Sequence, residues 1–213
     1  MTTPLIIPDM RLSLIGKARE IIDCDDPSHD LNHTLRVLNT AEHISKYEGG
    51  DLEVIIPAAL FHDAINHPKN DPKSNYSADE SAIVARDILI TFPGYDPEKI
   101  VKVEQAIIEH SYNKGIKPQI LESMIVQDAD RLDATGAVSI MRTFSSAGQM
   151  NMEFYNSKDP FCEQRKPGNY ALDLFYKRLL KVGDLMNTKT AKTLAEKRTD
   201  FLYSFLEQLR DEI

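Results

Sequence analysis

The stretch LEVIIPAALFHDA, residues 52–64, places an almost wholly apolar run directly before the polar pair His62-Asp63. A run of this kind is typical of a central helix that is buried on several sides. Pro57 interrupts the run, so we expect either a kink there or a position in the first turn of the helix. The fold class then depends on the segments that would surround such a helix.

The other segments of the chain have apolar residues at three- and four-residue steps, which is the periodicity of amphipathic helices. Ser77, with Glu80 three residues later, is expected to form a capping box, and Asp96 before Pro97 is typical of a helix start. Alternation of period two is nearly absent, so the sequence predicts an all-α fold. The expected helices cover residues 11–22, 29–47, 52–64, 77–92, 97–111, 118–133, 170–186 and 190–211.

The length of 213 residues corresponds to one domain, because a domain has about 150 residues on average. We find no internal repeat and no long linker, and we predict a single compact domain over residues 1–213. Residues 145–168 are expected to form a long surface loop, whose rings Phe154, Tyr155 and Phe161 could stack on a base or pack in a core. The two C-terminal helices are expected to pack within the chain, with a homodimer as the alternative.

Composition and charge restrict the cellular compartment of the protein and the kinds of partner that it can bind. Cys24 and Cys162 have no CxxC spacing, which favours a reducing compartment. The start of the chain has no basic segment before an apolar run, and no apolar run reaches 18 residues, so we predict a cytoplasmic protein without a membrane partner. The net charge of -8 argues against a polynucleotide partner but is compatible with a small anionic substrate held by a metal and a few local cations.

Two groups of histidines lie in expected helices. His62-Asp63 ends the apolar run, where a buried carboxylate is costly unless it is paired or bound to a metal; the alternative is a helix end that faces water. His29 and His33 in HDLNHTLRV, residues 29–37, are four residues apart, so both can face one site. We favour His33 as the ligand and His29 as a helix-start histidine that contacts backbone or solvent.

The third group is the acidic segment QDADRLDATGA, residues 127–137. Asp130 and Asp133 would share a helix face while Asp128 points elsewhere, and the alternative to a site is a salt-bridged face. Together, a histidine, the His-Asp pair and a distant aspartate supply two imidazoles and two carboxylates from separate helices. Such a set suits Mn, Fe, Mg or Zn with positions left for water and phosphate oxygens.

The sequence resembles the HD-domain metal-dependent phosphohydrolases, whose signature is H…HD…D, and in particular the small stand-alone bacterial HD hydrolases. The resemblance covers about residues 26–145 and rests on HDLNHTLRV, AALFHDAINH and QDADRLDA. It implies a helical HD core followed by a C-terminal helical extension over about 146–213, with Asp128 in an outer or capping role. It also implies a divalent metal, of undetermined identity, held by His33, His62, Asp63 and Asp130.

Further residues near these motifs are candidates for catalysis. Asp63 belongs to the predicted catalytic group as well as to the ligand set. His67 could serve as a general acid for the leaving oxygen, or it is simply a loop histidine. The resemblance places His110 near the cleft, where it could contact phosphate, protonate the leaving group or extend the site to a second metal; the alternative is a buried core histidine.

Local cations are expected to offset the charge of the substrate. The residues predicted to bind it are Lys69, Lys73 and Arg131, and Lys114 is a further local cation. Most lysines are merely solvated, so we expect only one or two of these side chains to matter.

The predicted function is a metal-dependent phosphohydrolase that uses a metal-activated water on a nucleotide or another phosphorylated metabolite. The small relatives point to conversion of a nucleoside triphosphate into a monophosphate and pyrophosphate. A 5'-nucleotidase, a cyclic-nucleotide phosphodiesterase and an alarmone hydrolase are alternatives on the same site. A non-catalytic metal- and nucleotide-binding module, or a helical scaffold, are alternatives of a different class.

Overall fold

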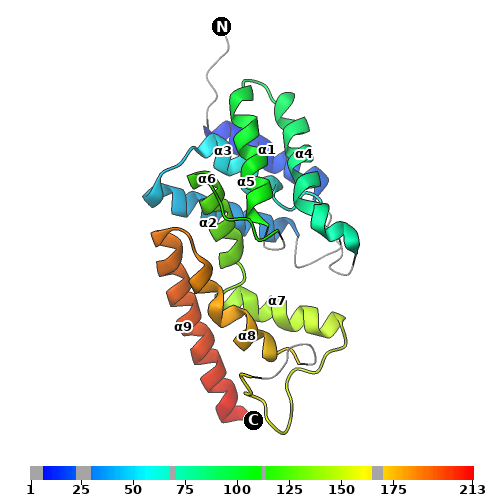
Figure 1. Cartoon of the computed structure of the whole chain (residues 1–213), viewed down its shortest axis with the longest axis vertical. Helices are drawn as coiled ribbons and strands as arrows, with labels where there is room; N and C mark the ends of the chain where they lie inside the picture. The colour runs from blue at the N-terminus through cyan, green and yellow to red at the C-terminus, as the bar shows by residue number, and fades with distance from the viewer. Residues whose placement is uncertain (1–6, 23–29, 68–70, 112–113, 165–169) are drawn as a thin grey trace. The chain divides into compact units, whose positions relative to one another are not determined.

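The computed structural model describes residues 7–22, 30–67, 71–111, 114–164 and 170–213, so Cys24 lies outside the described residues. The described chain is helical, with one isolated bridge between Glu153 and Tyr170, and the all-α prediction is confirmed (Figure 1). Its α-helices and its 3-10 helices, the latter labelled η, are α1 (Ile7–Ile21), α2 (Leu31–Glu48), α3 (Leu52–Phe61), η1 (Pro72–Tyr76), α4 (Ser77–Ile90), α5 (Pro97–His110), α6 (Leu121–Leu132), α7 (Gly136–Gln149), α8 (Asp173–Lys177), η2 (Leu179–Leu185) and α9 (Lys189–Glu212).

The predicted capping box of α4 is wrong. The helix begins at Ser77 itself, and no side chain caps it. The Ser77 hydroxyl instead accepts a hydrogen bond from the backbone N–H of His67 at 3.2 Å. The Glu80 carboxylate pairs with the His67 ring, with 2.6 Å between Oε2 and Nε2. Partners distant in sequence thus bind the two groups that a capping box would have used locally.

Two C-terminal predictions also differ from the structure. Residues 136–149 form α7, so the expected loop over 145–168 begins later, after Met150. The expected helix over 170–186 is divided into α8 and η2, because the backbone of Arg178 leaves the helical region at φ -130°. The Ser, Thr and Gly residues of α7 weaken its helical signal in the sequence, and it is packing that stabilises the helix.

The described chain forms two compact units, the first ending at Asp130 and the second beginning at Arg131. The prediction of one domain over the whole chain stays a prediction. In the first unit α3 packs against α1, α2, α4 and α5, and its residues from Val54 to Phe61 are all buried. The apolar run therefore forms the expected central helix, and the His62-Asp63 pair follows its last residue.

Pro57 lies inside α3, where it lacks the N–H that would bond to the carbonyl of Glu53 four residues earlier. Tyr95, just before α5, supplies the missing donor: its hydroxyl donates to the Glu53 carbonyl oxygen at 2.7 Å. Burial of the ring, followed by the charges of Asp51, Glu53 and Asp96, raises the pKa of Tyr95 above its ordinary value. This bond explains how the central helix accommodates a proline.

We expect Tyr95→Phe to lower the free energy of unfolding by about 1–2 kcal/mol, because the Glu53 carbonyl loses its donor. The fold favours the neutral phenol, so the contribution of Tyr95 is fully present below its ordinary pKa of 10.0 and is lost as the pH rises above it. Urea unfolding near pH 7 and near pH 11 measures both effects. The stability difference between wild type and variant should shrink at the higher pH.

The matched control is Tyr76→Phe, which removes a hydroxyl from a ring that is 61% exposed. It should change the unfolding free energy little at either pH, since exposed substitutions are close to neutral. Equal stability of wild type and Tyr95→Phe near pH 7 would contradict the role given to this hydroxyl.

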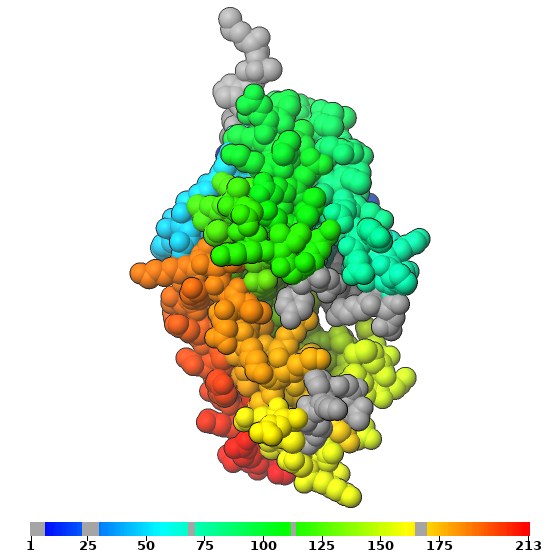
Figure 2. All heavy atoms as spheres, viewed as in Figure 1, coloured from blue at the N-terminus to red at the C-terminus, as the bar shows by residue number. Residues whose placement is uncertain are grey.

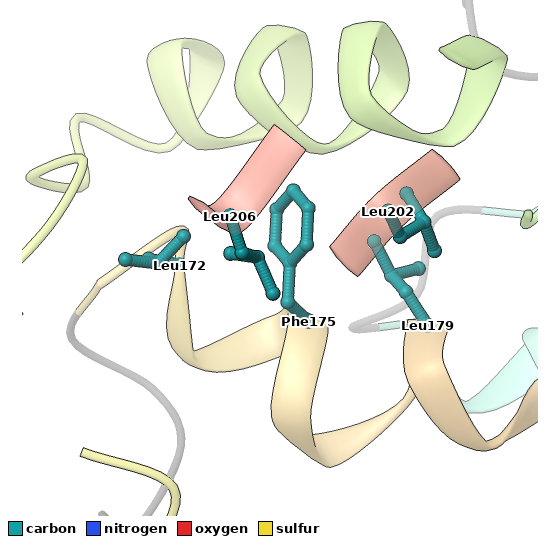
Figure 3. Close-up of a cluster of buried hydrophobic side chains, with 5 residues drawn as sticks. All are labelled: Leu172, Phe175, Leu179, Leu202 and Leu206. Carbon is teal, nitrogen blue, oxygen red and sulfur yellow. The ribbon is translucent and has the colours of Figure 1, made fainter. Parts of the chain in front are cut away.

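The second unit has its own apolar core between α8, η2 and α9. Its buried residues are Leu172, Phe175, Leu179, Leu202 and Leu206 (Figure 3). The Phe175 ring stacks on Phe205 of α9, with centroids 5.6 Å apart. Tyr155 and Phe161, from the segment after α7, pack against the same cluster. Tyr155 and Phe161 therefore pack in a core, whereas Phe154 is 55% exposed, and stacking of these rings on a base stays a prediction.

None of the helices in the described residues combines the length and the apolar character needed to cross a bilayer. The cytoplasmic location stays a prediction.

Candidate metal centre

Five histidine and aspartate side chains from four helices meet in the first unit. His33 is the third residue of α2, His62 and Asp63 directly follow α3, and His110 is the last residue of α5. Asp130 lies near the end of α6. All three imidazoles are buried, whereas the Asp63 and Asp130 side chains are 21% and 26% exposed. The carboxylates thus lie on the side of the group that solvent can reach.

The donor atoms of these side chains point toward one another. The Nε2 atoms of His33 and His62 are 3.2 Å apart. Asp130 Oδ1 lies 3.5 Å from the His33 nitrogen and 3.9 Å from the His62 nitrogen. Asp63 Oδ2 lies 3.8 Å and 3.5 Å from the same two nitrogens. The other oxygen of that carboxylate, Oδ1, lies 3.7 Å from His110 Nε2.

Backbone carbonyls orient two of the rings. His62 Nδ1 contacts the carbonyl oxygen of Ala59 at 2.9 Å, and His110 Nδ1 contacts that of Ile107. In each case the acceptor lies three residues earlier, in the helix that ends at the histidine or directly before it. Donation from Nδ1 leaves Nε2 as the nitrogen that faces the group, which is the arrangement that metal-binding histidines commonly use.

The surroundings shift the pKa values of His62 and His110 in opposite directions. Burial lowers the pKa of His62 and outweighs the opposing charges of Asp63 and Asp130, so the neutral ring is favoured. Burial also acts to lower the pKa of His110, but the contact with Asp63, the charge of Asp130 and the Ile107 carbonyl together raise it. A neutral imidazole is the form that binds a metal ion, so His62 has the protonation state of a ligand.

A divalent metal ion fits this donor set. Ligand atoms that share one ion at about 2.0–2.2 Å lie roughly 3–4 Å from one another, and the separations of 3.2–3.9 Å agree with this. In the described part of the chain, two clusters could hold an ion: His33 with His62 and Asp130, and His62 with Asp63 and His110. Mixed imidazole and carboxylate donors suit several divalent ions.

Comparison with known proteins identifies the family. The family model described as HD domain matches residues 30–135, inside the segment that carries the resemblance. YpgQ of Bacillus subtilis (strain 168) is 34% identical over 199 residues, which are 92% of this chain and 89% of that protein. The chain belongs to the HD-domain family.

Solved structures of HD proteins have the same fold along nearly the whole chain. An HD-superfamily hydrolase from Bacillus thuringiensis is 30% identical with a TM-score of 0.73, covering 97% of this chain and 98% of that one. The structure of Bacillus subtilis YpgQ in complex with ADP is 29% identical with a TM-score of 0.73, covering 97% and 96%. The similarity therefore extends beyond the HD domain into the C-terminal helices.

The His67 ring pairs with a carboxylate of α4. His67 is not a member of either cluster of possible metal ligands, and its Nε2 pairs with Glu80 of α4. The sequence around Glu80 indicates only a helix cap, because its partner is 13 residues away and no local pattern connects the two. The role of His67 as a general acid stays a prediction.

The structure describes two of the three predicted substrate-binding residues. Lys73 is exposed in η1, and the Arg131 guanidinium donates through Nη1 to the carbonyl of Leu185 at 2.6 Å within the second unit. Lys69 and the alternative ligand His29 lie outside the described residues. Substrate binding by Lys69, Lys73 and Arg131 stays a prediction.

The three aspartates of the acidic segment have different surroundings. Asp130 belongs to the HD-domain group described above, whereas Asp128 is fully buried. Asp133 accepts from Arg142 Nη1 at 2.7 Å in the second unit. The salt-bridged alternative therefore describes Asp133, and the choice of Asp130 as the candidate ligand agrees with its position.

Proposed function

We propose that the chain is a metal-dependent phosphohydrolase that converts nucleoside triphosphates into monophosphates and pyrophosphate. The observation that carries the proposal is the convergence of His33, His62, Asp63 and Asp130 on one point, with His110 beside Asp63. The ADP complex of YpgQ, 29% identical to this chain, supports a nucleotide as the ligand.

His33, His62, Asp63 and Asp130 would hold the ion. When bound, a divalent ion supplies Lewis-acid chemistry: it polarises phosphate oxygens and makes hydroxide available near neutral pH. Burial of the imidazoles excludes water from one side of the group, so substrate would approach from the side of the two partly exposed carboxylates. The carbonyls of Ala59 and Ile107 keep the rings in place without rearrangement during the reaction.

Asp63 would have a second task. Its Oδ2 faces His33 and His62, and its Oδ1 faces His110 Nε2. The carboxylate therefore orients the His110 imidazole, which lies beside the ligand set. As the water oxygen bonds to the α-phosphorus, the bond between that phosphorus and the pyrophosphate oxygen would break. His110 Nε2 would protonate this leaving oxygen.

The experiment is a panel of nucleoside tri-, di- and monophosphates, with and without Mn²⁺, in which pyrophosphate and phosphate are measured separately. We expect pyrophosphate and monophosphate in equal amounts from triphosphates, and no release after chelation of the metal. His62→Asn should lose the activity, because the buried ligand is replaced. His43→Asn, which alters an exposed histidine of α2, is the matched control and should keep it.

Release of different products from these nucleotides would assign a different reaction to the chain. Inorganic phosphate without pyrophosphate would assign a phosphatase or 5'-nucleotidase reaction, and activity limited to cyclic nucleotides would assign a phosphodiesterase. No turnover of any nucleotide with any divalent metal would contradict a nucleotide hydrolase altogether.

A further inference from the structure

Side chains at the start of α4 bind the segment that follows the His62-Asp63 pair, called the HD pair below. Ser81 of α4 accepts from the backbone N–H of Ile65 at 3.0 Å and donates to its carbonyl at 3.2 Å. The Ser77 hydroxyl accepts from the His67 N–H, and Glu80 pairs with the His67 ring at 2.6 Å. Ser81 is fully buried. These contacts fix the chain directly beyond two residues of the metal centre.

The start of α4 also contacts the segment that follows α5. Lys114, four residues after His110, places its Nζ 2.6 Å from Asp79 Oδ2. Asp79 is adjacent in sequence to Glu80, so α4 connects the segments that leave His110 and the HD pair. His110 itself lies 3.7 Å from Asp63 at the metal centre, so the two segments that α4 contacts begin at residues that also face each other.

The Lys114–Asp79 pair is open to solvent, because the two side chains are 22% and 39% exposed. In Figure 2 the side chains of α4 lie at the surface beside those of α5. An ion pair with this exposure contributes little to stability. An incoming anion can therefore reach the Lys114 ammonium and take the place of the Asp79 carboxylate.

A triphosphate needs local cations in a chain whose net charge is -8. Among the described candidates, Lys73 is exposed in η1 and Arg131 donates to the Leu185 carbonyl in the second unit. Lys114 differs from both, since its contact with α4 connects it to the segments that leave the metal centre. The ammonium is a compact charge that suits a phosphate whose orientation is set elsewhere.

We infer that Lys114 binds the phosphates that leave as pyrophosphate, and that Asp79 holds its ammonium in position until those phosphates arrive. The inference rests on the proposed function and adds the residue that distinguishes a triphosphate from a monophosphate. Asp79 is a positioning residue, because it acts on the substrate only through Lys114.

The test measures the affinity of inorganic pyrophosphate for the Mn²⁺-loaded full chain by calorimetry, and separately kcat and KM for a triphosphate. Lys114→Met should weaken pyrophosphate binding and raise KM by about tenfold or more, with kcat changed less. Lys114→Arg should restore most of the affinity. Binding of a nucleoside monophosphate should be unchanged in both variants. Lys117→Met removes an exposed lysine from the same segment and should leave both affinities at the wild-type value.

The Asp79→Asn variant distinguishes a phosphate-binding role of Lys114 from a purely structural role of the Lys114–Asp79 ion pair. It removes the competing charge but keeps a hydrogen-bonding oxygen, so pyrophosphate should bind several-fold more tightly. That gain should disappear when Lys114→Met is also present. Asp87→Asn, at an exposed position further along α4, is the matched control and should have no effect.

The two proposals fail in different ways. If the wild type releases pyrophosphate from triphosphates but Lys114→Met binds pyrophosphate as tightly as the wild type, the inference is wrong and the proposed function stands. If Lys114→Met and Asp79→Asn weaken binding alike, the pair is structural and the inference is again wrong. If the wild type turns over no triphosphate, the proposed function and the inference both fall.

Discussion

Asp63→Asn is expected to reduce turnover of the substrate on the order of 10³-fold or more while the chain remains folded. The two oxygens of Asp63 face both parts of the group: Oδ2 lies toward His33 and His62, and Oδ1 toward His110. An amide of the same shape removes the negative charge and replaces one acceptor by a donor. The variant would therefore lose a proposed metal ligand and the partner of His110 together.

The partial exposure of the Asp63 side chain, 21%, makes this variant suitable for a test of chemistry, since an isosteric change there disturbs little packing. Asp87→Asn on α4 removes the same charge from a side chain that is 64% exposed and should retain full activity. Steady-state turnover, with the melting temperature of each protein as a check on folding, gives the comparison. Activity of Asp63→Asn within tenfold of the wild type would exclude the proposed role.

Phe175→Ala is expected to lower the free energy of unfolding by about 3–5 kcal/mol, the largest effect on stability among the changes considered. The Phe175 ring is fully buried among Leu172, Leu179, Leu202 and Leu206 (Figure 3). It also stacks on Phe205 at 5.6 Å and lies 6.1 Å from Phe144 of α7. Truncation would leave a cavity between helices that cannot close without moving α8.

Equilibrium urea unfolding measures the loss, and Phe201→Ala provides the control on α9. The Phe201 side chain is 50% exposed, so its removal should cost less than about 1 kcal/mol. Similar stabilities for the two variants would show that the cluster around Phe175 does not hold the second unit together.

The ligand candidates could be predicted from the sequence because each lies in a local pattern. The apolar run of α3 ends at His62-Asp63, and helical periodicity places His33 and Asp130 on separate helices. Their convergence on one point required the family resemblance, because periodicity does not specify how helices pack. For His110 the sequence allows either a core position or a site position, and the structure places its Nε2 beside Asp63.

The contacts of α4 could not be predicted in the same way. Glu80 has the spacing of a helix cap, and only the folded chain brings it to His67. Lys114 and Asp79 likewise belong to segments that meet through packing of α5 on α4. Side chains whose partners are distant in sequence leave no periodic signal, so their roles follow from the structure alone.

The second unit contains a helix, α7, that local sequence patterns do not indicate. Gly136, with φ +68°, allows the turn from α6 into α7, and a side chain there would meet Arg198 at 3.2 Å. Apolar side chains of α7 such as Phe144 then pack on the α8 and α9 cluster. Neither the Gly residue nor the Ser-rich sequence that follows predicts a helix by propensity, because the stabilising contacts are tertiary.

Metal content tests the proposed centre most directly. The wild-type chain, His62→Asn and His43→Asn are each loaded with Mn²⁺, freed of unbound metal by gel filtration and analysed for metal per chain. We expect at least one ion on the wild type and on His43→Asn, and none on His62→Asn, because His62 belongs to both clusters of possible ligands. Equal metal content in all three proteins, or none in the wild type, would contradict a metal centre built on His62.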